Sequence, residues 1–146
     1  MSIQKPAIQS LSFKNRRKRP THRLPFVGEV HGKIGLSFWT VPKTGGYRGG
    51  CQTGEALARI YLKHLKDHSN DSGLTSLQKI ALDMFGCELA DSPEQDALRG
   101  QAIGFFSVLD VWLAGAAKHL HGGLDEHDNK ALLKAANTGL NLADGV

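Results

Sequence analysis

Residues 92–121, SPEQDALRGQAIGFFSVLDVWLAGAAKHLH, decide the fold. Ser92 is a typical N-cap, Pro93 suits the first helical position, and Gln95 completes a capping box. A helix over this stretch would be about 43 Å long at ~1.5 Å per residue, and Gly122-Gly123 would end it. We expect it to be the central core helix, because apolar residues recur on one face at helical spacing. They are Leu98, Ala102, Phe105, Phe106, Leu109, Trp112, Leu113, Ala116 and Leu120.

Two glycines of this stretch, Gly100 and Gly104, are four residues apart and therefore share a helix face. Small residues at that spacing let a second helix approach closely. Charged residues interrupt the stretch, which argues against insertion in a membrane. The pair therefore favours helix packing inside the protein over a seam between two copies.

The rest of the chain predicts a β-hairpin and three more helices. Residues 26–41 form the hairpin, because residues 34–41 alternate in hydropathy and His31-Gly32-Lys33 can form its turn. Pro42 ends the second strand. Further helices are predicted over residues 54–68, 76–85 and 126–141. The fold class is therefore α+β, mainly helical, with a basic N-terminal arm and a β-hairpin packed on about four α-helices.

The first and last of these helices have recognisable caps, Thr53 and Asp125. The last helix should bury one apolar face, which consists of Leu132, Leu133, Ala136 and Leu140.

The composition is that of an ordinary soluble domain. Of 146 residues, 40% are hydrophobic and 22% are charged, which excludes collagen-like, low-complexity and wholly disordered chains. Two cysteines cannot form a disulfide scaffold, and no run of 18 apolar residues indicates a transmembrane helix. The first 23 residues lack the apolar segment of a secretory signal, so a cytoplasmic protein is expected.

Positive charge is concentrated at the N-terminus. Residues 1–23 contain seven of the 18 Lys and Arg residues and none of the 14 Asp and Glu residues. The remaining 123 residues carry 11 bases against 14 acids. We therefore expect a disordered basic arm over 1–23 and a single globular domain over 24–146. Such arms commonly bind nucleic acid, and the candidate phosphate contacts are Lys14, Arg16, Arg17, Lys18, Arg19 and Arg23.

Residues 42–52, PKTGGYRGGCQ, predict a glycine-rich loop that leads into a helix. Backbone N–H groups at such a junction can bind an anion, although neither the P-loop nor the dinucleotide-binding pattern is present. Lys43, Tyr47 and Arg48 are candidate nucleic-acid contacts, and Trp39 could stack on bases. The alternatives are that the loop is a flexible connection and that Trp39 is a core residue.

Cysteine and histidine chemistry is a weaker hypothesis. Cys51 comes just before a predicted helix, where a thiolate is stabilised, and His64 or His31 could act as its base. His64 and His68 have the spacing of metal ligands on one helix face. No CxxC or HExxH pattern supports a metal site, so surface histidines, and no metal or cofactor, are expected.

The stretch Trp39–Leu65 is similar to small proteins of bacterial mobile elements, and it contains no catalytic motif. The predicted function is a non-enzymatic nucleic-acid-binding accessory protein, as a subunit of a larger nucleoprotein complex. Neither DNA binding nor RNA binding is favoured. The first alternative is a protein-interaction module or inhibitor whose arm docks in an acidic groove of a partner. The second is a small enzyme that depends on Cys51 or on a ligand of the glycine loop. No membrane partner is expected.

Overall fold

The structure is a computed structural model that describes residues 9–30, 35–68, 76–89, 91–120 and 123–143. It confirms a mainly helical α+β fold with a two-stranded hairpin. The chain divides into two compact units, Met1–Asp110 (unit 1) and Val111–Val146 (unit 2), and helix α3 runs through the boundary. A single domain over 24–146 stays a prediction. The described helices are α1 (Gly46–Asp67), α2 (Ser76–Phe85), α3 (Ser92–His119) and α4 (Asn129–Leu140).

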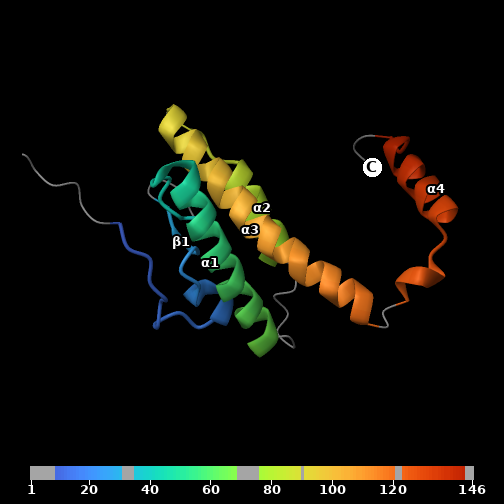
Figure 1. Cartoon of the computed structure of the whole chain (residues 1–146), viewed down its shortest axis with the longest axis horizontal. Helices are drawn as coiled ribbons and strands as arrows, with labels where there is room; N and C mark the ends of the chain where they lie inside the picture. The colour runs from blue at the N-terminus through green and yellow to red at the C-terminus, as the bar shows by residue number, and fades with distance from the viewer. Residues whose placement is uncertain (1–8, 31–34, 69–75, 90, 121–122, 144–146) are drawn as a thin grey trace, which may run out of the picture. The chain divides into compact units, whose positions relative to one another are not determined.

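Helices α1 and α3 lie side by side in unit 1, and glycines bring their backbones into contact (Figure 1). A Cβ on Gly100 would lie 2.1 Å from the Tyr47 carbonyl oxygen, and a Cβ on Gly50 would lie 2.3 Å from the Ala97 carbonyl oxygen. Only glycine fits where two backbones meet this closely. The Gly100 and Gly104 pair therefore packs inside the protein, as predicted.

This packing also explains a wrong prediction. Helix α1 begins at Gly46, with Gly45 as N-cap at φ +89°, rather than at residue 54 after a Thr53 cap. The loop predicted over residues 42–52 is therefore helical from Gly46 onward. Glycine is a poor helix former by itself, but Gly50 of this stretch, and Gly54 just beyond it, are part of the contact with α3.

The core of unit 1 is built around four aromatic rings. Trp39 and Phe105 have ring centroids 5.3 Å apart, Phe26 lies 5.5 Å from Trp39, and Tyr61 lies 6.0 Å from Phe105. The buried amide of Gln101 accepts a hydrogen bond from Trp39 Nε1 at 3.0 Å. Trp39 is 5% exposed, so its role as a core residue is correct and its role as a base-stacking residue is wrong.

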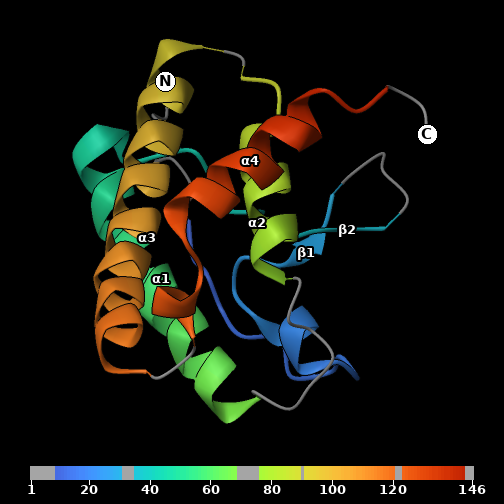
Figure 2. The same cartoon turned by 90° about the vertical axis from the view of Figure 1, so that its right-hand side faces the viewer.

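The hairpin is confirmed but short. Strands β1 (Gly28–Glu29) and β2 (Leu36–Ser37) pair antiparallel, and the predicted turn at residues 31–33 lies outside the described residues. The hairpin lies beside α2 (Figure 2), because the Phe38 N–H donates to Asp83 Oδ2 at 2.7 Å. A two-stranded ribbon is marginal alone, and this contact attaches it to the helices.

Helix α2 has the predicted bounds, whereas two other helix starts differ in detail. The carboxylate of Asp91, rather than Ser92, caps α3, because Asp91 Oδ1 accepts the Glu94 N–H at 2.9 Å. Helix α4 begins at Asn129 after a short 3-10 helix, η2 (Leu124–Glu126), so Asp128 rather than Asp125 occupies its N-cap position.

The apolar face predicted for α3 is buried only as far as Leu109. Beyond that residue Trp112, Leu113 and Leu120 are exposed, and the predicted buried face of α4 is exposed as well. By length and composition alone α3 could cross a membrane. The part of α3 before Val111 supplies buried residues to unit 1, as the core helix of a soluble protein does, so this is weak evidence. That the chain has no membrane partner stays a prediction.

Candidate nucleic-acid interface

The basic segment from Lys14 to Arg23 is folded rather than extended. The Lys14 backbone N–H donates to the Arg23 carbonyl at 2.9 Å, and a 3-10 helix, η1 (Pro20–Arg23), closes the segment. Thr21 Oγ1 lies 3.4 Å from His64 Nε2 near the end of α1. Over these residues the structure differs from the expected disordered arm. Residues 1–8 lie outside the described part of the chain.

Lys14 has a structural role in place of the predicted phosphate contact. Its ammonium donates to the carbonyl oxygens of Leu24 at 3.3 Å, Pro25 at 3.4 Å and also Val27. Burial, and secondarily the charge of Arg17, lowers the pKa of Lys14 below its ordinary value of 10.5. An ammonium that satisfies three carbonyl groups of a turn has few donors left for a ligand.

The other five cations of the segment remain on the surface. Arg17 pairs with Glu29 at 3.0 Å, and Arg23 Nε donates to the Arg17 carbonyl at 2.8 Å. Arg16, Lys18 and Arg19 are exposed, and their side chains make no hydrogen bond or ion pair with the described part of the chain. Their N–H donors therefore remain available to a partner.

A cluster of like charges surrounds His22. The imidazole packs edge-on against Phe38 with centroids 6.2 Å apart, and Lys79 Nζ lies 5.3 Å from the centroid of the same ring. Burial lowers the pKa of His22 below its ordinary value of 6.5, and the charges of Arg19, Arg17 and Lys79 lower it further. We call His22, Arg17, Arg19 and Lys79 the basic cluster. Charge segregation along the sequence does not indicate Lys79, because this residue lies on α2, far along the chain from the basic segment.

The basic cluster and the candidates of the glycine-rich stretch do not meet. Thr21 contacts α1 at His64, which is 16 residues after Arg48, or about 24 Å along a helix at ~1.5 Å per residue. Exposed cations on α1 lie between and beyond these points: Arg59, Lys63 and Lys66. The two groups of candidate residues therefore belong to separate regions of unit 1.

At the start of α1, Tyr47 and Arg48 are exposed. A hydrogen bond with the Cys51 thiol raises the pKa of the Tyr47 phenol, while nearby Arg99 acts in the opposite direction. Residues 11–13 approach this end of α1, because Phe13 and Gln52 line one pocket of about 560 Å³. This region combines the ring of Tyr47 with the guanidinium groups of Arg48 and Arg99, and only Arg48 was predicted from the sequence.

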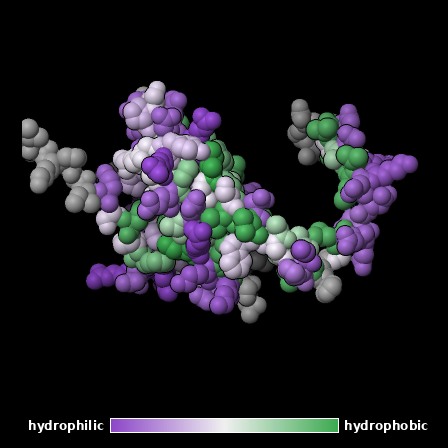
Figure 3. All heavy atoms as spheres, viewed as in Figure 1, coloured by the Kyte–Doolittle hydropathy of each residue, from purple (hydrophilic) through white to green (hydrophobic). Residues whose placement is uncertain are grey.

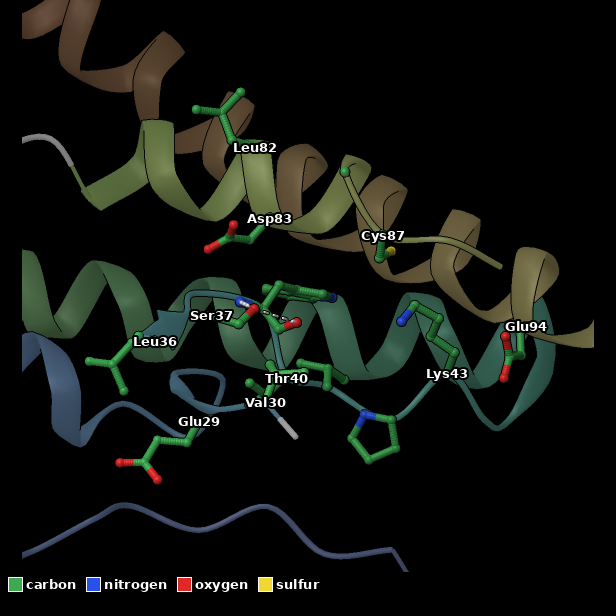
Figure 4. A pocket seen from close by; sticks show the side chains of 15 residues that line it. Glu29, Val30, Leu36, Ser37, Thr40, Lys43, Leu82, Asp83, Cys87 and Glu94 are labelled. Carbon is green, nitrogen blue, oxygen red and sulfur yellow. Dashed lines mark hydrogen bonds between the residues drawn. The ribbon is translucent and has the colours of Figure 1, made fainter. Parts of the chain in front are cut away.

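Lys43 faces a different environment (Figure 4). It lines a pocket of about 570 Å³ together with Glu29, Asp83 and Glu94. Glu29 is already paired with Arg17, and the two further carboxylates against one ammonium make this pocket unfavourable for a phosphate. Lys43 is therefore the weakest of the predicted nucleic-acid contacts.

The cysteine hypothesis lacks a base among the described residues. Cys51 lies inside α1 rather than before it, and His64 is 13 residues farther along the same helix, about 20 Å away. His31 lies outside the described residues. The rings of His64 and His68 have centroids 4.8 Å apart, but no group of three His, Cys, Asp or Glu side chains in the described ranges could hold a metal ion.

Comparison with known proteins finds no matching family model, no matching curated protein and no matching solved structure. Functional inference therefore depends on the geometry of this chain alone.

His22 should report on the basic cluster directly. Its pKa in the native protein is expected below 6.5, and removal of one neighbouring charge in Lys79→Met should raise it. Between the native pKa and 6.5 the unfolded chain binds more protons, so acidification through this window should lower the free energy of unfolding. A two-dimensional NMR titration of the imidazole measures the pKa. A native pKa at or above 6.5, unchanged in Lys79→Met, would show that the charges do not act on His22.

Proposed function

We propose that this protein is a non-enzymatic nucleic-acid-binding accessory protein, a subunit of a larger nucleoprotein complex, and that Arg16, Lys18 and Arg19 contact phosphates. The observation that carries the proposal is the folded basic segment, in which the exposed Arg16, Lys18 and Arg19 make no hydrogen bond or ion pair within the described part of the chain. Keeping like charges together costs free energy, which a polyanion would recover. Salt-dependent phosphate contact follows from this arrangement.

The contacts within the segment divide its cations by role. Lys14 holds the turn together, and Arg17 shares its charge with Glu29. Arg16, Lys18 and Arg19 are the exposed cations we assign to phosphate contact. Tyr47 and Arg48 form a second region at the start of α1, about 24 Å along the helix from His64, which Thr21 contacts. A nucleic acid long enough to follow α1 would reach both regions.

The test is fluorescence anisotropy with single- and double-stranded DNA and RNA at two salt concentrations. The logarithm of the binding constant for duplex DNA falls linearly with the logarithm of the salt concentration, and the loss of three phosphate contacts should make this slope shallower by about 2.7. The variant Arg16→Ala/Lys18→Ala/Arg19→Ala should therefore bind roughly 10- to 100-fold more weakly than the wild type at low salt. Deletion of residues 1–23 is a poorer test, since it removes Lys14 from the turn that Lys14 supports.

The matched control removes the same charge from unit 2, in Lys118→Ala/Lys130→Ala/Lys134→Ala. The control should bind nearly as tightly as the wild type. Equal losses in the two triple variants would mean that only net charge matters and would contradict the proposed interface. Wild-type binding no tighter than ~10⁻⁴–10⁻⁶ M would reject nucleic acid as the partner and favour an acidic protein that accepts the same side chains.

A further inference from the structure

Two segments of unit 2 carry the same apolar pattern. The last turns of α3 contain Trp112-Leu113-x-x-Ala116-x-x-x-Leu120, and α4 contains Leu132-Leu133-x-x-Ala136-x-x-x-Leu140. The Leu120 N–H donates to the Ala116 carbonyl at 2.8 Å, so the helical path includes Leu120. Positions i, i+1, i+4 and i+8 lie on one side of a helix. Each segment therefore presents one apolar stripe with alanine at the same place.

Both stripes face solvent. Trp112 is 61% exposed and Leu113 is 62% exposed in α3, while Leu133 is 65% exposed and Leu140 is 82% exposed in α4. In Figure 3 apolar side chains gather along one side of α4 and polar side chains along the other. Within residues 111–120 and 123–143 no residue is buried.

Exposed stripes of this size need a partner. A helix of 12 residues is marginal in water without tertiary packing, and a unit of about 36 residues is too small to form a stable core alone. The large apolar side chains of the two stripes are each 49% to 82% exposed. Soluble monomers seldom leave continuous apolar stripes uncovered, and such stripes typically mark an interaction surface.

Charge favours a second copy of this chain as that partner. Unit 2 contains three lysines against four carboxylates, whereas unit 1 contains 15 Lys and Arg residues against 10 Asp and Glu residues. Two copies of unit 2 can therefore meet without strong repulsion between their own side chains. The matched stripes also allow a two-fold symmetric dimer. In it the α3 stripe of each copy packs on the α4 stripe of the other copy.

We infer that unit 2 is a dimer interface, in which α4 of each copy packs on the exposed last turns of α3 of the other. This inference does not depend on the proposed function. A dimer would present two basic segments, one from each copy.

The test is the mass of the full-length protein by light scattering across a dilution series. The expected mass is twice the 15.8 kDa of one chain. Trp112→Glu and Leu133→Glu should each give a monomer in which unit 1 stays folded, since both side chains are exposed and lie outside unit 1. The helical signal of unit 2 should fall in both variants, because a 12-residue helix is marginal without packing. The matched control is Leu82→Glu on α2, whose side chain is 64% exposed in unit 1, and this variant should remain dimeric.

Three results would overturn the inference. A wild-type monomer in which an aqueous quencher cannot reach Trp112 would mean that the two stripes pair within one chain. A wild-type monomer with an accessible Trp112 at all concentrations would mean that no second copy binds. Binding to neutral phosphatidylcholine vesicles by a monomer would assign the stripes to a lipid surface instead.

Discussion

Replacing Gly104 by alanine should lower the free energy of unfolding by roughly 3 kcal/mol or more, although the change adds a single methyl group. The new Cβ would stand 2.2 Å from the Cys51 carbonyl oxygen and 3.0 Å from the Cys51 Cα. Both atoms belong to the backbone of α1, so no flexible side chain can move aside. Relief requires α1 and α3 to separate, which would open cavities around Phe105 and Tyr61. Urea denaturation followed by circular dichroism measures the loss.

Gly115→Ala is the matched control on the same helix. Nothing lies within 4 Å of the Cβ that it would add, and alanine favours a helix over glycine by about 1 kcal/mol. This variant should therefore be at least as stable as the wild type. A free energy of unfolding for Gly104→Ala that lies within about 1 kcal/mol of the wild-type value would mean that α1 and α3 do not approach this closely.

The glycine contact shows where sequence reasoning succeeded and where it failed. The spacing of Gly100 and Gly104 predicted that another helix would approach α3, which is correct. Local propensity predicted a loop over 42–52, because each glycine disfavours a helix. Gly50 and Gly54 have the same four-residue spacing, and this spacing was the signal that the helix packed against α3 contains them. Pairing between distant segments outweighed the local preference of the glycines.

The sequence predicted which kind of side chain forms the candidate site, but not how those side chains are arranged. The charge asymmetry found Arg16, Lys18 and Arg19, which are exposed in the structure. It could not distinguish Lys14, because the carbonyl groups that hold its ammonium converge only when the turn at 24–27 forms. It could not include Lys79, whose proximity to His22 depends on the packing of α2.

Periodicity identifies an apolar helix face but not the surface that covers it. The stripes on α3 and α4 were correctly located in the sequence, and burial within one chain was the default expectation. In the structure Trp112 and Leu133 are exposed instead. The same residues therefore change from predicted core positions to positions in an interface between copies.

The second large effect is expected for Gln101→Leu, a substitution of similar size in the core. Gln101 is 1% exposed. Its Oε1 accepts from Trp39 Nε1 at 3.0 Å, and its Nε2 donates to the Pro42 carbonyl at 2.9 Å. Leucine would leave a buried indole N–H and a carbonyl without partners, at a cost of about 1–3 kcal/mol for each group. Urea denaturation should show a loss of roughly 2–5 kcal/mol.

A double-mutant cycle separates the lost hydrogen bond from a packing defect. Trp39→Phe removes the indole N–H, so Gln101→Leu should cost less in that background, with a coupling of roughly 1–3 kcal/mol. Gln95→Leu, an exposed change in the first turn of α3, should alter stability by no more than about 0.5 kcal/mol. Costs that simply add across the cycle would mean that the Trp39–Gln101 bond contributes nothing. The position of the residue 39–42 segment against α3, and with it that of the hairpin, would then depend on the aromatic packing of Trp39 against Phe26 and Phe105.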